Sequence, residues 1–193
     1  MPADTSSTLA APAAALSALR VRWSRQQAIV NFRGDPSDAS LAQALSGAVG
    51  SGGLPWPTRP AECPTDGPHR VVWAGPDDWF VIAPAGSQEA LMQALRAAAG
   101  SRHHAVTDVS SGYVVLMLAG AAARDVLAQG CPLDLHPRSF PVGQSAGTVF
   151  FKASVWMWLT GDEAFELLVR SSFVGYVEEM LRRCTLECGI AAA

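Results

Sequence analysis

The chain has 193 residues, of which 49% are hydrophobic and 16% are charged, and its net charge is −3. This size suffices for one domain of generous size or for two small, closely packed halves. The absence of any run of Lys and Arg excludes a nucleic-acid-binding protein, because such proteins need a basic face. No stretch approaches the roughly 18 apolar residues of a membrane-spanning helix, so the sequence predicts no membrane contact.

The charged fraction of 16% is low, since about a quarter is usual for a soluble domain. A surface poor in charge suggests that other protein covers part of it. An alanine-rich composition that dilutes the charges explains the value equally well, and both interpretations stay open.

The four cysteines, Cys63, Cys131, Cys184 and Cys188, are few and scattered. This pattern predicts a reduced, cytoplasmic protein and not a disulfide scaffold. Cys184 and Cys188 are spaced to share one helix face, but two thiolates without further ligands make a poor zinc site. We therefore interpret both as small buried residues near a helix end.

The ends of the chain are predicted to lie outside the folded domain. We interpret residues 1–24 as a flexible arm, because their alanine-rich part is interrupted by Pro12 and lacks the basic lead-in of a secretory signal. An α+β domain is expected over residues 25–185, followed by a C-terminal tail over residues 186–193.

The first half of the domain is predicted to alternate strands with helices. Asp35 is the expected N-cap of the first helix, with Pro36 at the first helical position, and Ser87 is the expected cap of the second helix, which Gly100 ends. Short apolar runs predict strands over residues 28–32, 70–73, 79–83 and 104–109.

A loop rich in Gly and Pro covers residues 50–68. Proline removes backbone donors and fixes φ, which disfavours regular structure here, and a loop of this length is usually functional or forms an interface. Trp56 lies in its middle. It is either an anchor on a neighbouring protein or a side chain that packs against its own domain.

The second half continues the same pattern. Ser171 or Ser172 is the expected cap of the last helix, in which Arg182 and Arg183 are expected in the final turn. Strands are predicted over residues 113–118, 146–153, 155–159 and 164–169, a helix over 120–129, and a loop over 133–141. The apolar stripe of the last helix comprises Phe173, Tyr176, Val177, Met180, Leu181 and Cys184. The order predicts an α+β fold made of two split β-α-β (ferredoxin-like) units packed together.

The sequence contains no motif of a known catalytic site, such as a Gly-rich phosphate loop or a G-x-S-x-G elbow. His103 and His104 are adjacent, so on a strand they point to opposite faces and do not share a metal. Asp108 precedes a Ser-Ser-Gly turn, where its carboxylate either binds a ligand amine or accepts the backbone donors of the turn. We therefore expect no catalytic residue, metal site or bound cofactor on this chain.

Residues 106–140 carry a recognisable series of motifs. These are Asp108-Val109-Ser110, Leu118-Ala119-Gly120, Ala123-Arg124-Asp125-Val126-Leu127 and Gly130-Cys131-Pro132-Leu133-Asp134-Leu135, joined by Phe32-Arg33-Gly34, Gly75-Pro76-Asp77-Asp78-Trp79, Phe165-Glu166-Leu167-Leu168-Val169 and Arg170-Ser171-Ser172-Phe173. In this order and spacing the chain resembles the gamma subunit of heterotetrameric sarcosine oxidase, over about residues 28–181. The long Pro-rich loop, Gly112 and the aromatic strand at residues 155–158 depart from the family pattern and leave a related N-methyl amine open as the substrate.

The resemblance implies a complex that oxidises N-methylglycine to glycine with oxygen and yields hydrogen peroxide. The methyl carbon leaves as formaldehyde or passes to tetrahydrofolate. FAD, FMN and NAD belong to the alpha and beta partner subunits and zinc to the delta subunit, while the gamma subunit carries none of them. The implied fold is similar to the folate-binding part of the glycine-cleavage aminomethyltransferase.

Three hypotheses follow. The chain is a non-catalytic structural subunit of such an oxidase, a stand-alone folate-binding or aminomethyltransferase-like protein that uses Asp108, or an assembly module of another amine-oxidising complex. The first hypothesis predicts a surface that meets other subunits. Its candidate residues are Trp56, Leu133, Asp134, His136, Arg138, Phe140, Trp156 and Trp158.

Overall fold

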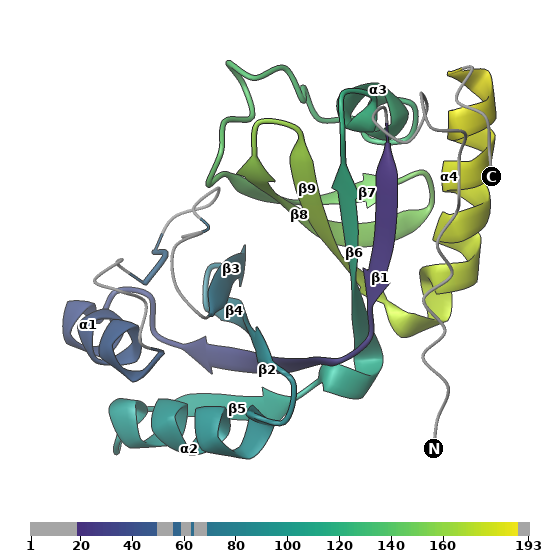
Figure 1. Ribbon diagram of the computed structural model, residues 1–193. Helices are drawn as coiled ribbons and strands as arrows, with labels where there is room; N and C mark the ends of the chain where they lie inside the picture. Colours follow the sequence, from purple (N-terminus) through teal and green to yellow (C-terminus); the bar gives the residue numbers. More distant parts are fainter. Residues whose placement is uncertain (1–18, 50–55, 59–62, 64–68, 189–193) are drawn as a thin grey trace, which may run out of the picture. The chain divides into compact units, whose positions relative to one another are not determined.

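The computed structural model describes residues 19–49, 56–58, 63 and 69–188. They divide into two compact units, each built around one sheet with helices beside it (Figure 1). The central unit comprises residues 26–113 and 143–147, and the terminal unit comprises residues up to 25, 114–142 and those from 148 onwards. Strand β7 contributes residues to both.

The central unit is a complete split β-α-β pair. Its elements are β2 (Gln27–Gly34), α1 (Ala39–Ala48), β3 (Arg70–Gly75), β4 (Asp78–Pro84), α2 (Gln88–Ala99) and β5 (His104–Asp108). Its sheet has the order β3-β4-β2-β5, and β4 pairs antiparallel with β2 and β3. Each helix therefore connects two strands that are not neighbours, with one other strand between them, which confirms the predicted ferredoxin-like topology.

The core of the central unit lies between one face of this sheet and the two helices. Strand β2 contributes Val30 and Phe32, which are fully buried. Leu41 of α1 and Leu95 of α2 pack into the same cluster. The alternation along the strand and the helical spacing of the leucines place these side chains on the inner faces, which explains why the sequence predicts these elements well.

The caps of these helices differ from the sequence prediction. Asp38, and not Asp35, caps α1, since its Oδ1 accepts the N–H of Leu41 at 2.9 Å. Asp35 instead accepts the N–H of Ser37 at 2.8 Å, so a turn precedes the helix. Ser87 occupies the N-cap position of α2, but its hydroxyl donates to the carbonyl of Pro84 at 2.6 Å. Both residues are thus part of local turns that compete with capping.

The terminal unit repeats the split topology with a different chain order. Its elements are β1 (Arg20–Ser24), β6 (Tyr113–Ala119), α3 (Ala123–Ala128), β7 (Ser145–Phe150), β8 (Ala153–Gly161), β9 (Ala164–Arg170) and α4 (Val174–Glu187). The sheet order is β1-β6-β9-β8-β7. Strand β1 takes the place beside β6 that corresponds to β5 beside β2 in the central unit. A segment from before the central unit thus completes this sheet.

Strand β1 corrects the expected flexible arm. The prediction assigned residues 1–24 to that arm, whereas Arg20–Ser24 pair antiparallel with β6. At the other end, α4 extends to Glu187 and so enters the expected tail. Only short stretches of alternating residues mark β1, and five residues give a weak periodic signal.

Helix α4 has the predicted apolar stripe with a shift at its start. Ser171 begins a short 3-10 turn that ends at Phe173, and no side chain caps the helix that follows. Val177, Leu181 and Cys184 are buried as predicted, whereas Phe173 is 36% exposed. Arg182 and Arg183 lie before the last turn and donate to Glu179, whose pKa they lower to about 2.

The predicted strand over residues 146–153 is interrupted by a turn. Strand β7 ends at Phe150, and β8 starts at Ala153. Phe151 adopts a left-handed backbone conformation with φ of 52°, which residues other than glycine rarely adopt. Its N–H donates to the carbonyl of Gly130 at 2.7 Å. Its ring lies so close to Gly130 that a Cβ added there would overlap two ring carbons.

We expect Gly130→Ala to lower the free energy of unfolding by about 1–3 kcal/mol, because the added methyl group overpacks this contact. Gly175→Ala in α4 is the matched control, since outside the helix backbone no atom lies within 4 Å of the place that its methyl group would take. Gly175 is the exposed second residue of α4, so this control should change stability by less than about 0.5 kcal/mol. Urea titration of both variants measures the difference, and equal stability of the two would contradict the close contact at Gly130.

Candidate functional site

The loop over residues 133–140, between α3 and β7, contains most of the residues predicted to meet another protein. The carboxylate of Asp134 accepts the N–H of His136 at 3.0 Å and the hydroxyl of Ser139 at 2.5 Å. The ring Nδ1 of His136 accepts the N–H of Arg138 at 3.2 Å, and its carbonyl accepts the N–H of Phe140 at 2.9 Å. The loop is therefore ordered by its own polar groups.

These bonds favour the charged form of Asp134. The hydroxyl of Ser139 and the N–H of His136 hold the pKa of this carboxyl below its usual range. A lowered pKa means that the stabilisation is fully present above the usual carboxyl pKa. It is lost as the pH falls through the lowered value. The two bonds to Asp134 are thus retained throughout the neutral range.

Arg124 of α3 attaches this loop to the rest of the terminal unit. Its guanidinium donates to the carbonyls of Leu135 and Asp162, the latter at 2.8 Å, and lies 5.1 Å from the ring centre of Phe165. Phe140 stacks on the same ring, with 6.3 Å between its centre and that of Phe165. The motif that contains Arg124 marked a family resemblance, but no role for the side chain was predicted, because its two acceptors lie far away in sequence.

The structure divides the predicted loop residues into two groups. Asp134, His136 and Arg138 are exposed and Leu133 is half-buried, so their side chains are accessible in this chain. Phe140 is only 2% exposed. Its prediction as a surface contact is therefore wrong, since the ring anchors the loop internally.

We expect Arg124→Lys to increase hydrogen exchange over residues 133–140 and to lower the free energy of unfolding by about 1–2 kcal/mol. A lysine ammonium does not reproduce the fork that reaches two separate carbonyls. Arg138→Lys is the control in the same loop, and we expect it to change stability by less than about 0.5 kcal/mol. Exchange rates that respond equally in both variants would show that Arg124 does not organise the loop.

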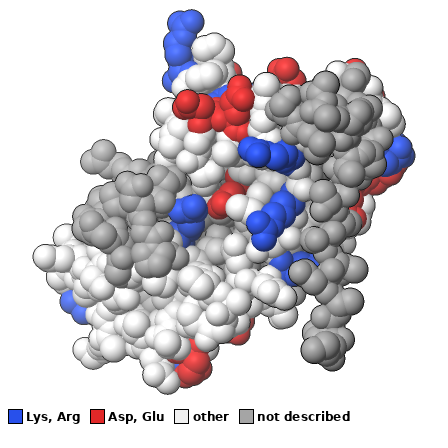
Figure 2. Space-filling view, in the orientation of Figure 1, with Lys and Arg blue, Asp and Glu red and all other residues white. Residues whose placement is uncertain are grey.

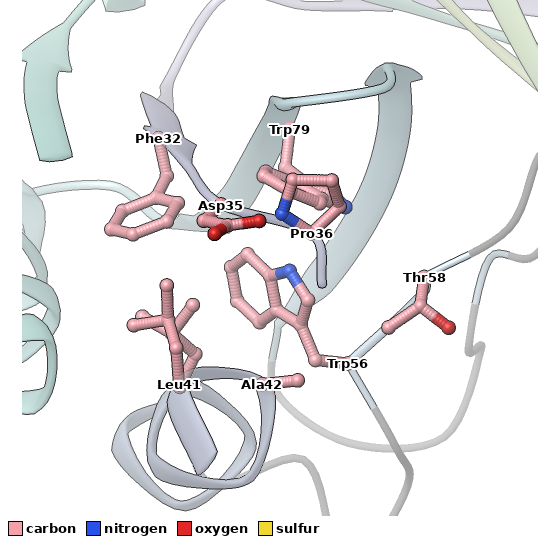
Figure 3. Close-up of a pocket in the computed structure, with 9 residues that line it drawn as sticks. Phe32, Asp35, Pro36, Leu41, Ala42, Trp56, Thr58 and Trp79 are labelled. Atoms are coloured by element: carbon pink, nitrogen blue, oxygen red, sulfur yellow. The ribbon is translucent and has the colours of Figure 1, made fainter. Parts of the chain in front are cut away.

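Trp56 lies inside the central unit. It is 3% exposed, and its ring centre is 5.7 Å from that of Phe32 and 5.8 Å from that of Trp79. Its indole lies between α1 and Trp79 (Figure 3). Of the two predicted roles, packing against its own domain is therefore correct, and the anchor on a neighbouring protein is wrong.

A small cavity adjoins this tryptophan. Its lining is almost entirely apolar and includes Leu41, Leu45, Trp56 and Trp79, with Asp35 at its margin (Figure 3). Its volume is about 10 Å³, which is at the lower limit of what a buried cavity needs to hold one water molecule. The Nε1 of Trp56 has no hydrogen-bond acceptor among the described residues. The cavity is too small for a substrate or an organic cofactor.

The two tryptophans of β8 differ in exposure. Trp158 is fully buried, and its Nε1 donates to the carboxylate of Glu166 on β9 at 2.9 Å. Its predicted role as an exposed interface residue is therefore wrong. Trp156 is partly exposed and remains accessible. An aromatic strand in a sequence does not reveal which of its rings face the core, because that depends on neighbouring strands.

Asp108 is engaged by the turn that follows it. Its Oδ1 accepts the N–H of Ser110 at 2.9 Å and the hydroxyl of the same residue at 2.5 Å. That hydroxyl also accepts the N–H of Ile29 at 2.9 Å, so the turn is joined to β2. Of its two predicted roles, Asp108 thus has the second, in which it accepts the donors of the turn. Its carboxylate remains exposed.

The described residues contain no group of three or more His, Cys, Asp or Glu side chains placed to hold a metal ion. Burial raises the pKa of the Cys184 thiol to about 11, whereas Cys188 is exposed and its Sγ accepts a hydrogen bond from Gln129 at 2.9 Å.

None of the helices in the described part of the chain is both long and apolar enough to span a membrane. Figure 2 shows that uncharged residues cover much of the visible face.

The fold places the chain in a class of α+β proteins that includes the glycine-cleavage aminomethyltransferases. Aminomethyltransferase T from Bartonella henselae matches it with a TM-score of 0.57 and 15% identity, over 86% of this chain and 45% of that chain. This likeness concerns the fold alone and confirms the predicted architecture.

The chain belongs to the sarcosine oxidase, gamma subunit family, whose family model matches residues 33–187. It is 38% identical over 152 residues to the sarcosine oxidase subunit gamma of Corynebacterium sp. (strain P-1), covering 79% of this chain and 72% of that protein. The same figures hold for the subunit gamma from Arthrobacter sp. A chain of the heterotetrameric sarcosine oxidase from Corynebacterium sp. U-96, in complex with pyrrole 2-carboxylate, matches with a TM-score of 0.80 and 31% identity, over 92% of this chain and 87% of that chain.

Proposed function

We propose that this chain is the gamma subunit of a heterotetrameric sarcosine oxidase and acts as a structural, non-catalytic component of that complex. The complex oxidises sarcosine to glycine, reduces oxygen to hydrogen peroxide, and releases the methyl carbon as formaldehyde or transfers it to tetrahydrofolate. Its alpha, beta and delta subunits carry FAD, FMN, NAD and zinc. The observation that carries this proposal is the family match over residues 33–187, together with 38% identity to curated gamma subunits.

A structural role is supported by what the polar side chains of this chain do. Asp108 and Asp134 accept hydrogen bonds from their own turns, Arg124 bonds to two backbone carbonyls, and Glu166 accepts a bond from Trp158. Each of these groups stabilises the fold, and a catalytic group needs instead to reach a substrate. The scattered cysteines favour a cytoplasmic location for the complex.

Co-expression with the other three subunits tests this proposal. A tagged copy of this chain is expected to co-purify with the alpha, beta and delta chains, and the purified complex is expected to produce hydrogen peroxide from sarcosine. Omitting this chain should lower the yield of assembled complex. The activity per flavin of whatever complex remains should change little. Failure of the tagged chain to retain the flavin-carrying subunits would overturn the proposal.

A panel of N-methyl amines tests the substrate in the same preparation. We expect sarcosine to give the highest kcat/KM. A higher value for another N-methyl amine would retain the gamma-subunit role but assign the complex to a different substrate. Titration of the isolated chain with tetrahydrofolate tests the folate-binding alternative. That alternative requires that the chain binds tetrahydrofolate and that Asp108→Ala abolishes the binding.

We also propose that the exposed part of the loop over residues 133–140 lies at a subunit interface. Leu133, Asp134, His136 and Arg138 are accessible, and internal hydrogen bonds join the last three to one another. An ordered loop loses less conformational entropy on binding than a flexible one. Hydrogen exchange over this loop is expected to slow when the complex forms, and unchanged exchange would contradict the assignment.

A further inference from the structure

Most described cationic side chains have a partner within the chain. Arg33 pairs with Asp77 and Arg102 with Asp38, each at 2.8 Å. Arg182 and Arg183 share Glu179, while Arg96 and Arg124 donate to backbone carbonyls. The cations of the described residues are thus mostly neutralised or hydrogen-bonded within the fold.

Arg20, Arg22 and Arg25 differ from this pattern. All three are exposed, and none has an ion-pair or hydrogen-bond partner among the described residues. Arg138 and Lys152 share this property but lie far away in sequence, whereas the three arginines follow one another along and just after β1. We call them the β1 arginines. Figure 2 shows basic side chains over the region where Figure 1 draws β1 and β6.

The geometry of β1 aligns two of these charges. Arg20 and Arg22 are two residues apart on a strand, so both project from the same face of the sheet, roughly 7 Å apart. Their partners in the register are Ala119 and Met117 of β6, which carry no charge. No carboxylate of the neighbouring strand therefore stands opposite either guanidinium.

Among the strands that the structure describes, β1 is also the last on its side of the five-stranded sheet, as the order β1-β6-β9-β8-β7 shows. In an antiparallel pair, alternate residues direct their N–H and C=O groups away from the neighbouring strand. Such an edge accepts an extended segment as an additional strand. The same edge thus offers backbone hydrogen bonds and a row of positive charges with a two-residue repeat.

We propose that β1 and the β1 arginines bind an extended acidic segment of a partner subunit, which adds to the sheet as a sixth strand. This inference rests on the proposed function, since it names a surface that the complex uses. Carboxylates at alternate positions of an extended segment have the same spacing as Arg20 and Arg22. The net charge of this chain is −3, so most of its surface does not attract an acidic segment, and the β1 arginines confine attachment to this edge.

The test is the affinity of the full-length chain for the co-purified remaining subunits, measured at two salt concentrations. The variant is Arg20→Gln with Arg22→Gln, and the matched control is Arg182→Gln with Arg183→Gln, which removes the same charge from α4. We expect the β1 variant to raise the Kd about tenfold at low salt and to weaken the salt dependence of binding. The control is expected to stay within about twofold, and Arg20→Lys with Arg22→Lys should retain most of the affinity. Backbone amides of residues 20–24 should exchange more slowly in the wild-type complex.

The outcomes separate the two proposals. The acidic-segment proposal is wrong if the wild-type chain binds and the β1 variant binds with the same affinity. It is also wrong if the control variant lowers the affinity as much as the β1 variant does. Either result leaves the gamma-subunit role intact. Failure of the wild-type chain to bind any of the subunits overturns both. If the isolated chain forms a dimer that the β1 variant abolishes, the occupant is a second copy and the proposal is wrong. Thermal unfolding of each variant confirms that it is folded.

Discussion

Replacing Trp158 with alanine is expected to lower the free energy of unfolding by about 3–5 kcal/mol, the range for removing a large aromatic side chain from a core. Trp158 is fully buried on β8, so the substitution leaves a cavity that the sheet cannot close without moving its neighbours. It also removes the indole N–H that donates to the carboxylate of Glu166 at 2.9 Å. The loss of this hydrogen bond to a half-buried carboxylate costs further free energy. A loss this large is a substantial fraction of the about 5–15 kcal/mol by which native proteins are stable.

Two other variants distinguish the contributions. Trp156→Ala changes the same residue type on the same strand, but this side chain is partly exposed, so we expect a loss below about 2 kcal/mol. Trp158→Phe keeps an aromatic ring but removes the donor, and its loss should lie between those of the two alanine variants. Chemical denaturation measures all three. Equal losses for Trp156→Ala and Trp158→Ala would contradict the different burial of the two rings.

Trp79→Ala is expected to destabilise the central unit by a similar amount, about 3–5 kcal/mol. The ring is 2% exposed and contacts both Phe32 and Trp56, with centroid distances of 6.1 and 5.8 Å. Its Nε1 donates to the carbonyl of Pro57 at 2.7 Å. The substitution therefore empties the centre of the aromatic cluster and frees the segment that contains Trp56. Faster proteolytic cleavage near Pro57 should accompany the loss of stability.

Trp73 provides the control for this experiment, because it lies in the same sheet on β3 and is only partly buried. We expect Trp73→Ala to cost less than about 2 kcal/mol and to leave cleavage near Pro57 unchanged. If Trp79→Ala leaves both stability and cleavage at wild-type levels, the aromatic cluster does not hold this part of the chain.

The sequence predicts the elements of this fold where a long periodic pattern marks them. Helix α2 and the strands β4 and β6 are examples, because their apolar residues recur at the spacing of the element and continue for several turns or residues. The family motifs predict the relation between the chain and gamma subunits, which the comparisons confirm.

Predictions that depend on tertiary contacts were less accurate. Trp56 and Trp158 are large apolar residues, which is why the sequence suggests that they lie at an interface. In the structure, residues from other elements bury both rings. Arg124 finds its acceptors 11 and 38 residues away, so no local pattern reveals its role. Asp35 and Asp38 are both good capping residues, and only the turn at Ser37 decides between them.

The place of β1 beside β6 has a consequence for how the chain is made. The ribosome synthesises β1 first and then residues 26–113, which supply all four strands and both helices of the central unit. The terminal sheet needs β8 and β9, which emerge much later, so β1 has to wait for partners that follow the whole central unit. We therefore expect the central unit to fold first during synthesis, and the terminal unit to form only after β8 and β9 have been synthesised. Any surface that the terminal unit offers to other subunits then becomes available later than the surface of the central unit.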